Sequence, residues 1–377
     1  MSEFHDTPSS ENPTCTTDLF LWLIPFALCI IGAVMIFSLT LPDSISRGGV
    51  LSSHLGMRQL QWITLGLVSM VIMYLFPLSF WKRTSGVLWI FAVMLTFVTL
   101  IHGLGFEAGG AKRWIRIAGF RVQPLEFLSL AFVIHLAKIL SDEGLKRKDA
   151  FTKLLVIMGV SIVPVILQPD LGGSILLFLI GMAMFVERKG WLLPLLTGGM
   201  MLPVLLFLIF GESYRLRRYI AFMDPWKDPL DKGFQVIQGL VAFSNGGVLG
   251  AGIGKGLQKL NYLPAAHTDF IFAALGEEFG LLGTGGVTFL FSFWTYRIYG
   301  VYRRANSGYI KVFVWGLCVS ILLPFFINIA GVTKLIPLTG MPLPFVSYGG
   351  SSLVTSWMSI GILLRCSRDA VMGKDLT

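Results

Sequence analysis

Ten apolar stretches, each near the length that crosses a bilayer, run through this chain of 377 residues and limit what it can fold into. An α-helix rises about 1.5 Å per residue, so about 20 apolar residues span the hydrocarbon core. We therefore predict an all-α polytopic membrane protein with about ten transmembrane helices, in which residues 19–366 form one membrane domain. The stretches lie near residues 19–41, 60–80, 86–104, 124–140, 152–168, 171–187, 191–210, 270–300, 310–331 and 347–365.

The composition agrees with this fold class and excludes several others. Hydrophobic residues make up 54% of the chain and charged residues only 14%, whereas soluble domains carry about 25% charged residues. The first 18 residues contain no Lys or Arg, so they lack the basic region of a cleavable signal peptide. The four cysteines form no CxxC pair, which argues against a disulfide framework or a zinc site.

The distribution of basic residues predicts the orientation of the chain. Cytoplasmic loops of membrane proteins carry an excess of Lys and Arg. With ten spans and the N-terminus inside, the short cytoplasmic loops and the C-terminal end hold fourteen Lys and Arg, and the short outer loops hold seven. We therefore expect residues 1–18 and 367–377 to be cytoplasmic tails. The same distribution accounts for the net charge of +9 without nucleic-acid binding.

A loop of unusual length, residues 211–269, lies between the seventh and eighth predicted helices and on the outer side in this topology. Loops of such length inside a compact architecture are usually functional or disordered. Aromatic residues recur along this one, which favours an ordered lid packed on the helices over a flexible linker.

One carboxylate, Asp269, stands where this loop joins the eighth apolar stretch, in YLPAAHTDFIFAALGEE at 262–278. It is either a helix cap, a role that Thr268 could equally take, or a functional acid at the membrane edge. Glu277 and Glu278 follow about 12–14 Å further along a continuous helix. Ionisable groups at such depth rarely face lipid, so these two either bond to a neighbouring helix or form a proton or cation site.

Other polar positions also have two interpretations. Asp170 follows Pro169 and is typical of an N-cap, whereas Glu126 lies in the first turn of a helix, near three arginines of the preceding outer loop. The sequence GAGIGKG at 250–256 fails the P-loop pattern and is interpreted as a flexible turn, in which Lys255 could contact an anionic headgroup. Residues 337–352 hold three prolines and three glycines, so they form either a re-entrant segment or a rigid turn.

Several of these segments together resemble the SEDS family (shape, elongation, division and sporulation). The motifs occur in family order along most of the chain, and the ten helices and large outer loop agree with the family's architecture. QKLNYLP and LGEE resemble the FtsW branch and TGMPLPF the RodA branch, with the balance nearer FtsW. The matching segments are GGAKRWI at 109–115, QPLEF at 123–127, LQPDLG at 167–172, DPWKDP at 224–229, GFQ at 233–235, YLPAAHTDFIFAALGEE at 262–278 and PLPFVSYGGSS at 342–352.

The resemblance implies a glycosyltransferase that polymerises lipid II into peptidoglycan glycan strands at the outer face of the bacterial cytoplasmic (inner) membrane. It further implies a class B penicillin-binding protein transpeptidase as partner, within a division or elongation complex of membrane proteins. The aspartate that the family requires for polymerisation falls on Asp269. Three positions depart from the family pattern, namely Ala265 for Glu, Leu125 for Ser and Ser129 for Lys.

The expected chemistry is attack of a sugar hydroxyl on an anomeric carbon, with Asp269 as general base and cations stabilising the departing lipid diphosphate. A divalent cation, magnesium or manganese, is neither required nor excluded by the sequence. Two rival functions remain open, a lipid II flippase and a non-catalytic division scaffold. The predicted substrate-binding residues are Lys112, Arg113, Trp114, Arg116, Glu126, Arg215, Arg218, Lys255, Lys259, His267 and Ser347.

Overall fold

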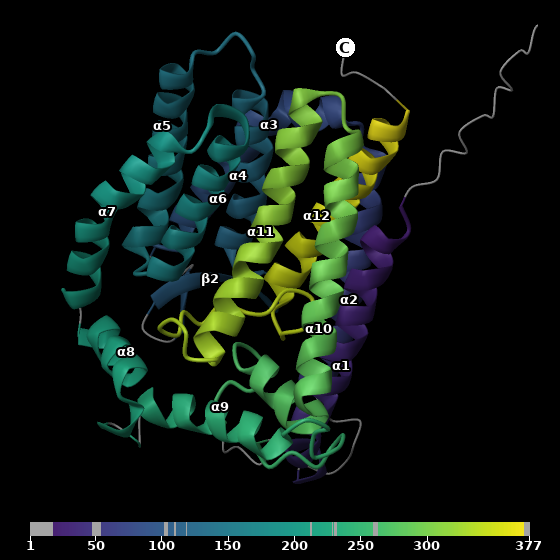
Figure 1. Ribbon diagram of the computed structural model, residues 1–377, viewed down its shortest axis with the longest axis vertical. Coiled ribbons are helices and arrows are strands. Elements are labelled where there is room, and N and C mark those ends of the chain that lie inside the picture. Colours follow the sequence, from purple (N-terminus) through teal and green to yellow (C-terminus); the bar gives the residue numbers. More distant parts are fainter. Residues whose placement is uncertain are drawn as a thin grey trace, which may run out of the picture.

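The computed structural model describes residues 18–46, 54–101, 105–108, 111–117, 119–211, 213–227, 229, 232–258 and 263–372. Within these ranges ten long helices coincide with the ten apolar stretches of the sequence (Figure 1). They are α1 (Phe20–Ser46), α2 (His54–Leu75), α3 (Leu78–Val98), α4 (Pro124–Leu140), α5 (Arg147–Leu167), α6 (Leu171–Lys189), α7 (Leu192–Phe210), α10 (Ile271–Arg304), α11 (Gly308–Val332) and α12 (Gly350–Val371).

The helices form one elongated bundle whose long axis is shared by most of them. Among the described residues, α1, α2, α5, α6 and α11 are long and apolar enough to cross a membrane. The C-terminal end of α12 lies at one end of the bundle, and two helices of the long loop, α8 (Ser213–Met223) and α9 (Lys232–Gly246), lie at the other (Figure 1). The predicted outer loop thus lies opposite the end of α12, while its orientation in a membrane and the count of ten crossings stay predictions.

A small antiparallel sheet that the sequence did not predict follows α3, so the description all-α omits one element. Its strands are β1 (Gly105–Ala108), β2 (Ala111–Ile117) and β3 (Phe120–Val122), in the order β1-β2-β3. The register pairs Phe106 with Trp114 and Arg116 with Arg121. The sheet packs on α4 and α12, and the amide of Gln123 donates to Ser351 Oγ at 2.9 Å.

The long loop contains two helices, α8 (Ser213–Met223) and α9 (Lys232–Gly246), and the short 3-10 helix η2 (Pro225–Lys227). Helix α9 packs along α10, and α8 contacts both α7 and α9. The described part of the loop is therefore an ordered layer on the end of the bundle, as its aromatic residues predicted.

Helix α10 is broken at Gly280, whose φ of 66° and ψ of −160° are not helical. The break divides α10 into a short segment, residues 271–279, and a long segment, residues 281–304. The turn that follows α9 fits into this break, because the amides of Leu281 and Leu282 donate to the carbonyls of Gly247 and Val248. Thus the short segment has its own direction, set by the loop.

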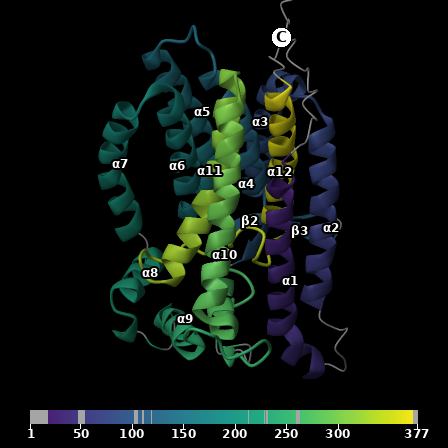
Figure 2. The ribbon, with the colours of Figure 1, turned by 45° about the vertical axis from the view of Figure 1, so that its right-hand side comes forward.

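Small residues set how closely the other helices approach. On α12, Gly361 lies against the backbone carbonyl of Met70 on α2, so that a larger side chain would not fit. Helix α7 is the exception to close packing: it lies at the rim in both views (Figures 1 and 2) and contacts mainly α6 and α8.

Replacing Gly280 with alanine should lower stability, because its backbone conformation is open essentially only to glycine and a Cβ would meet the backbone of Val248 and Gly250. Such strain costs about 1–3 kcal/mol. Thermal unfolding of the purified variant in detergent should show a Tm several degrees below that of the parent.

The matched control is Gly285→Ala in the same helix, where a Cβ would meet nothing within 4 Å. Alanine should be neutral or mildly stabilising at this helical position. Equal Tm values for the two variants would show that the break at Gly280 is not a fixed part of the fold.

Candidate functional site

Asp269 does not cap the helix that it precedes. The N-cap of α10 is Phe270, and no side chain bonds to the free amides there. Instead the Thr268 hydroxyl donates to Asp269 Oδ1 at 2.5 Å. The other carboxylate oxygen, Oδ2, lies close to Gly340: a Cβ added to this glycine would be 3.7 Å from it. The capping interpretation of Asp269 is therefore wrong, and one of its oxygens faces the segment that follows α11.

Two irregular segments hold each other in place around Asp269. The Ser347 hydroxyl donates to the carbonyl of Thr268 at 2.5 Å and accepts from the amide of Leu343 at 2.8 Å. The Asn328 side chain, from α11, donates to the carbonyls of Asp269 at 2.8 Å and Met341 at 2.7 Å. These bonds satisfy backbone groups that no helix could satisfy. Ser347 was predicted to bind substrate, but its hydroxyl is buried and bonds to protein groups.

His267 belongs to the same arrangement. Its carbonyl accepts from the amide of Tyr348 at 2.8 Å, and the two rings meet edge to face with centroids 5.9 Å apart. Burial lowers the pKa of His267, and the nearby Asp269 carboxylate opposes part of that change. The ring therefore lies beside Asp269 in its neutral form near pH 7.

Asp269 lines a pocket together with two basic residues, Arg218 of α8 and Lys334 after α11. Arg218 Nη1 donates to the carbonyl of Leu338 at 3.1 Å. A Cβ on Gly340 would lie 3.9 Å from this nitrogen as well as 3.7 Å from Asp269 Oδ2. The glycine thus leaves open a space that the acid and the guanidinium both border.

Arg113 of the sheet is paired within the protein. Its Nε lies 3.5 Å from Asp170 Oδ2, while Asp170 Oδ1 accepts from the amide of Gly173, which confirms the N-cap on α6. Asp170 also lies near the segment that faces Asp269. A Cβ added to Gly172 would lie 3.7 Å from Asp170 Oδ1 and 3.7 Å from the carbonyl oxygen of Thr339, and Thr339 directly precedes Gly340. Added together, these contacts and those of Gly340 mean that the carboxylates of Asp170 and Asp269 are at most roughly 15 Å apart.

The remaining predicted cations are spread more widely. Lys112 and Trp114 lie half-buried on β2, and Arg116 is exposed on the same strand. Arg215 lies on α8, but its side chain falls outside the described residues, as does all of Lys259. Lys255 lies in the turn that packs on the far end of the short segment of α10, about 12 Å along the helix from Asp269.

Glu277 and Glu278 join α10 to its surroundings. Glu277 accepts from the amides of Leu257 and Gln258, both at 3.1 Å, and from the Asn245 side chain at 3.2 Å. Glu278 accepts from the Ser38 hydroxyl of α1 at 2.7 Å. Their protein partners favour the bonded interpretation, and whether they lie at membrane depth stays a prediction.

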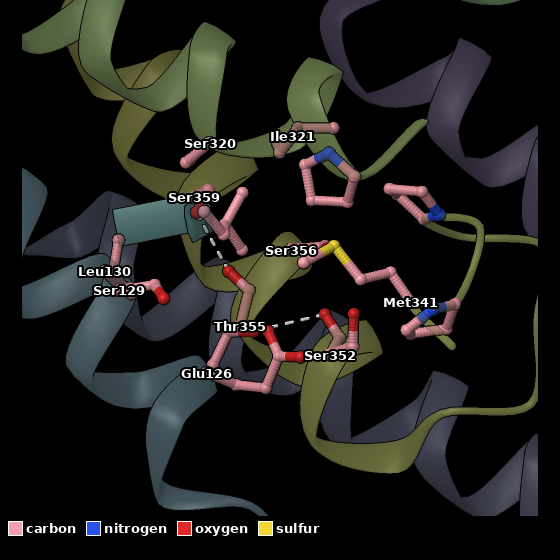
Figure 3. Close-up of a pocket in the computed structure, with 14 residues that line it drawn as sticks. Glu126, Ser129, Leu130, Ser320, Ile321, Met341, Ser352, Thr355, Ser356 and Ser359 are labelled. Atoms are coloured by element: carbon pink, nitrogen blue, oxygen red, sulfur yellow. Dashed lines mark hydrogen bonds between the residues drawn. The ribbon is translucent and has the colours of Figure 1, made fainter. Parts of the chain in front are cut away.

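Glu126 lines a second cavity, whose other polar lining is made of hydroxyls (Figure 3). Its predicted contact with substrate is untested. Within the residues that the structure describes, no group of three or more His, Cys, Asp or Glu side chains could hold a metal ion. The divalent cation therefore remains a prediction, and no step below depends on it.

Sequence reasoning missed two residues of the site. Asn328 is a lone amide inside an apolar stretch, and a polar residue at such a position is itself a signal. Lys334 carried no such signal, since it is one basic residue in a short loop and only the fold brings it to the pocket of Asp269.

The fold and the site together define a polytopic helical membrane protein with a carboxylate and cations at the end of the bundle where the long loop lies. A family model, FTSW_RODA_SPOVE, described as "Cell cycle protein", matches residues 18–371. The chain therefore belongs to the FtsW, RodA and SpoVE family, and the resemblance to SEDS proteins is confirmed.

Similar proteins point to the same family. The chain is 36% identical over 358 residues to "Probable peptidoglycan glycosyltransferase FtsW" of Geobacter sulfurreducens, covering 93% of this chain and 95% of the relative. It is 34% identical to a protein of the same name in Thioalkalivibrio sulfidiphilus, covering 94% and 90%. The names of these relatives agree with the prediction that the chain is nearer the FtsW branch of the family than the RodA branch.

Solved structures share the fold. A chain of a peptidoglycan synthase complex, described for its coordination of polymerization and crosslinking, aligns with a TM-score of 0.77 at 24% identity, covering 94% of this chain and 98% of that one. Thermus thermophilus Rod shape determining protein RodA aligns with a TM-score of 0.70 at 23% identity, covering 96% and 99%.

Replacing Ser347 with alanine should destabilise the protein even without ligand, because the Thr268 carbonyl and the Leu343 amide would lose their partner. An unsatisfied buried group costs about 1–3 kcal/mol, which thermal unfolding in detergent would register as a lower Tm. A residue that only contacted substrate would leave the Tm of the free protein unchanged.

Ser292→Ala is the matched control, because that hydroxyl is exposed and bonds only to its own helix at 2.8 Å. Its removal should change stability by no more than about 0.5 kcal/mol. If Ser347→Ala were equally harmless, the bond between the two irregular segments would not determine the position of Asp269.

Proposed function

We propose that this protein is a peptidoglycan glycosyltransferase that polymerises lipid II at the outer face of the bacterial inner membrane, with Asp269 as its general base. The observation that carries the proposal is the carboxylate of Asp269, which does not cap its helix and lines a pocket with Arg218 and Lys334. Relatives that are 34–36% identical over most of the chain are named probable peptidoglycan glycosyltransferases, which favours a polymerase over a flippase or a scaffold.

The proposed step is an inverting displacement at the anomeric carbon of the donor sugar. The acceptor hydroxyl oxygen forms the new β-1,4 bond to that carbon, and its proton passes to Asp269. The bond to the lipid diphosphate breaks, and the diphosphate leaves with the electron pair. A sugar hydroxyl is a weak nucleophile, so a positioned base contributes about 10²–10⁴ in rate.

The hydrogen bonds around Asp269 suit this role. Thr268 donates to Oδ1 at 2.5 Å and so fixes the orientation of the carboxylate. Oδ2 then faces the space beside Gly340, which Arg218 also borders. Cations preorganised near a leaving diphosphate stabilise its developing charge, and Arg218 and Lys334 are the described cations of this pocket.

The proposed setting follows from topology and from the family. We place both tails in the cytoplasm, so that α8, α9 and the pocket of Asp269 would face the outer side, where we propose that lipid-linked sugar is polymerised. Since a related fold occurs in a complex that coordinates polymerization and crosslinking, we assign this chain a cross-linking transpeptidase as partner, within a division complex.

Asp269→Asn should slow glycan synthesis strongly, because the amide keeps the shape of the side chain but cannot accept the proton. The purified variant, assayed with its transpeptidase partner and lipid II in detergent, should polymerise about 10²–10⁴ times more slowly than the parent. Asp142→Asn, in the exposed loop before α5, should keep the parental rate.

An Asp269→Asn variant that polymerised at the parental rate would exclude Asp269 as the base. If neither the parent nor the variant made glycan but liposomes carrying the parent translocated lipid II, the flippase function would replace this proposal.

Arg218→Ala should slow polymerisation by at least about tenfold, because it removes a cation that borders the same space as Asp269. Its neighbour Arg217 is exposed on α8, and Arg217→Ala removes an equal charge from the same helix with no expected effect on rate. Rates measured across lipid II concentrations would separate the two variants, and equal rates would remove Arg218 from the site.

A further inference from the structure

A second cavity lies between α4, α11, α12 and the irregular segment before α12 (Figure 3). One carboxylate, Glu126, and six hydroxyls line it together with apolar side chains. None of the lining residues is Lys, Arg or His. The hydroxyls belong to Ser129, Ser320, Ser352, Thr355, Ser356 and Ser359.

The carboxylate of Glu126 makes no hydrogen bond or ion pair with any other residue that the structure describes. The nearby acid Asp170 differs in this respect, because Arg113 lies 3.5 Å from it. Glu126 lies in the first turn of α4, where the helix dipole favours an ionised carboxylate. An ionised Glu126 supplies one negative charge to a lining that holds no basic side chain.

Four of the six hydroxyls present oxygen lone pairs to the cavity, because their protons are already used within the protein. The hydroxyl protons of Ser129, Ser320, Thr355 and Ser359 are donated to carbonyls of their own helices at distances of 2.9–3.0 Å, so their lone pairs remain for a ligand. Pro324 lines the same wall and cannot donate to the Ser320 carbonyl, one turn earlier on α11. A lining of oxygen acceptors with one negative charge suits a hard cation and disfavours an anion.

The charge of the site decides between kinds of cation. A divalent ion against a single carboxylate would leave a net positive charge in the bundle interior, and uncompensated interior charge is costly. A monovalent cation against an ionised Glu126 leaves no net charge. We propose that the Glu126 cavity is a binding site for a sodium ion, held by the Glu126 carboxylate, by serine and threonine hydroxyls and by water.

Ser129 gives this site a direct internal test, because its side chain lines the cavity and lies one helical turn from Glu126. A lysine at this position would place an ammonium group where the ion would lie. The Ser129→Lys variant should therefore fold without sodium and lose the capacity to bind it.

Sodium binding can be measured directly, without lipid II, by scintillation proximity with radioactive sodium on the purified full chain in detergent. The parent should bind saturably, and Glu126→Gln and Ser129→Lys should lose at least about nine-tenths of the specific signal while keeping a cooperative thermal transition. Glu143→Gln, which alters a carboxylate that is 82% exposed, should bind like the parent.

Three results would overturn the assignment. The first is no saturable binding by the parent, which would leave a cavity filled with water. The second is parental binding by folded Glu126→Gln. The third is displacement of the label by magnesium at lower concentrations than by unlabelled sodium, which would indicate a divalent site. All three are independent of glycan synthesis, so they leave the role of Asp269 untouched.

Discussion

Non-helical backbone inside a helical membrane bundle must find its hydrogen-bond partners within the protein, and the whole candidate site depends on how this chain meets that requirement. The segments before α10 and before α12 are both irregular and lie against each other. Ser347 and Asn328 supply the bonds that neither segment can make alone. Asp269 is therefore positioned by groups that lie about 60–80 residues further along the chain, and its own helix contributes little to its placement.

Hydropathy alone predicted the ten long helices, because a segment that crosses lipid must satisfy its backbone locally and be apolar over a fixed length. The same local signal could not predict the sheet at 105–122, whose strands are short and carry Lys112, Arg113 and Arg116. Nor could it predict the break at Gly280, since this glycine lies in a continuous apolar stretch and the break is fixed by contact with residues 247–250.

The site was predictable in part. Asp269 was distinguished by its place at the join of loop and helix, and Arg218 was included only as one basic residue among many. Lys334 was missed. Lys255 was predicted to belong to the site, but in the fold it lies near the opposite end of the short segment of α10 from Asp269. Charge and motif identify which residues are available, whereas the grouping of residues depends on tertiary contacts that are distant in sequence.

The break in α10 has a mechanical consequence. Residues 271–279 form a rod about 13 Å long, joined to the rest of its helix through one non-helical residue. At its far end Glu277 and Glu278 bind residues of α1, α9 and the turn at 257–258, and at its near end lies Asp269. The rod therefore acts as a lever: a partner that shifted the outer turn by an ångström or two would move the carboxylate relative to the cations across the pocket.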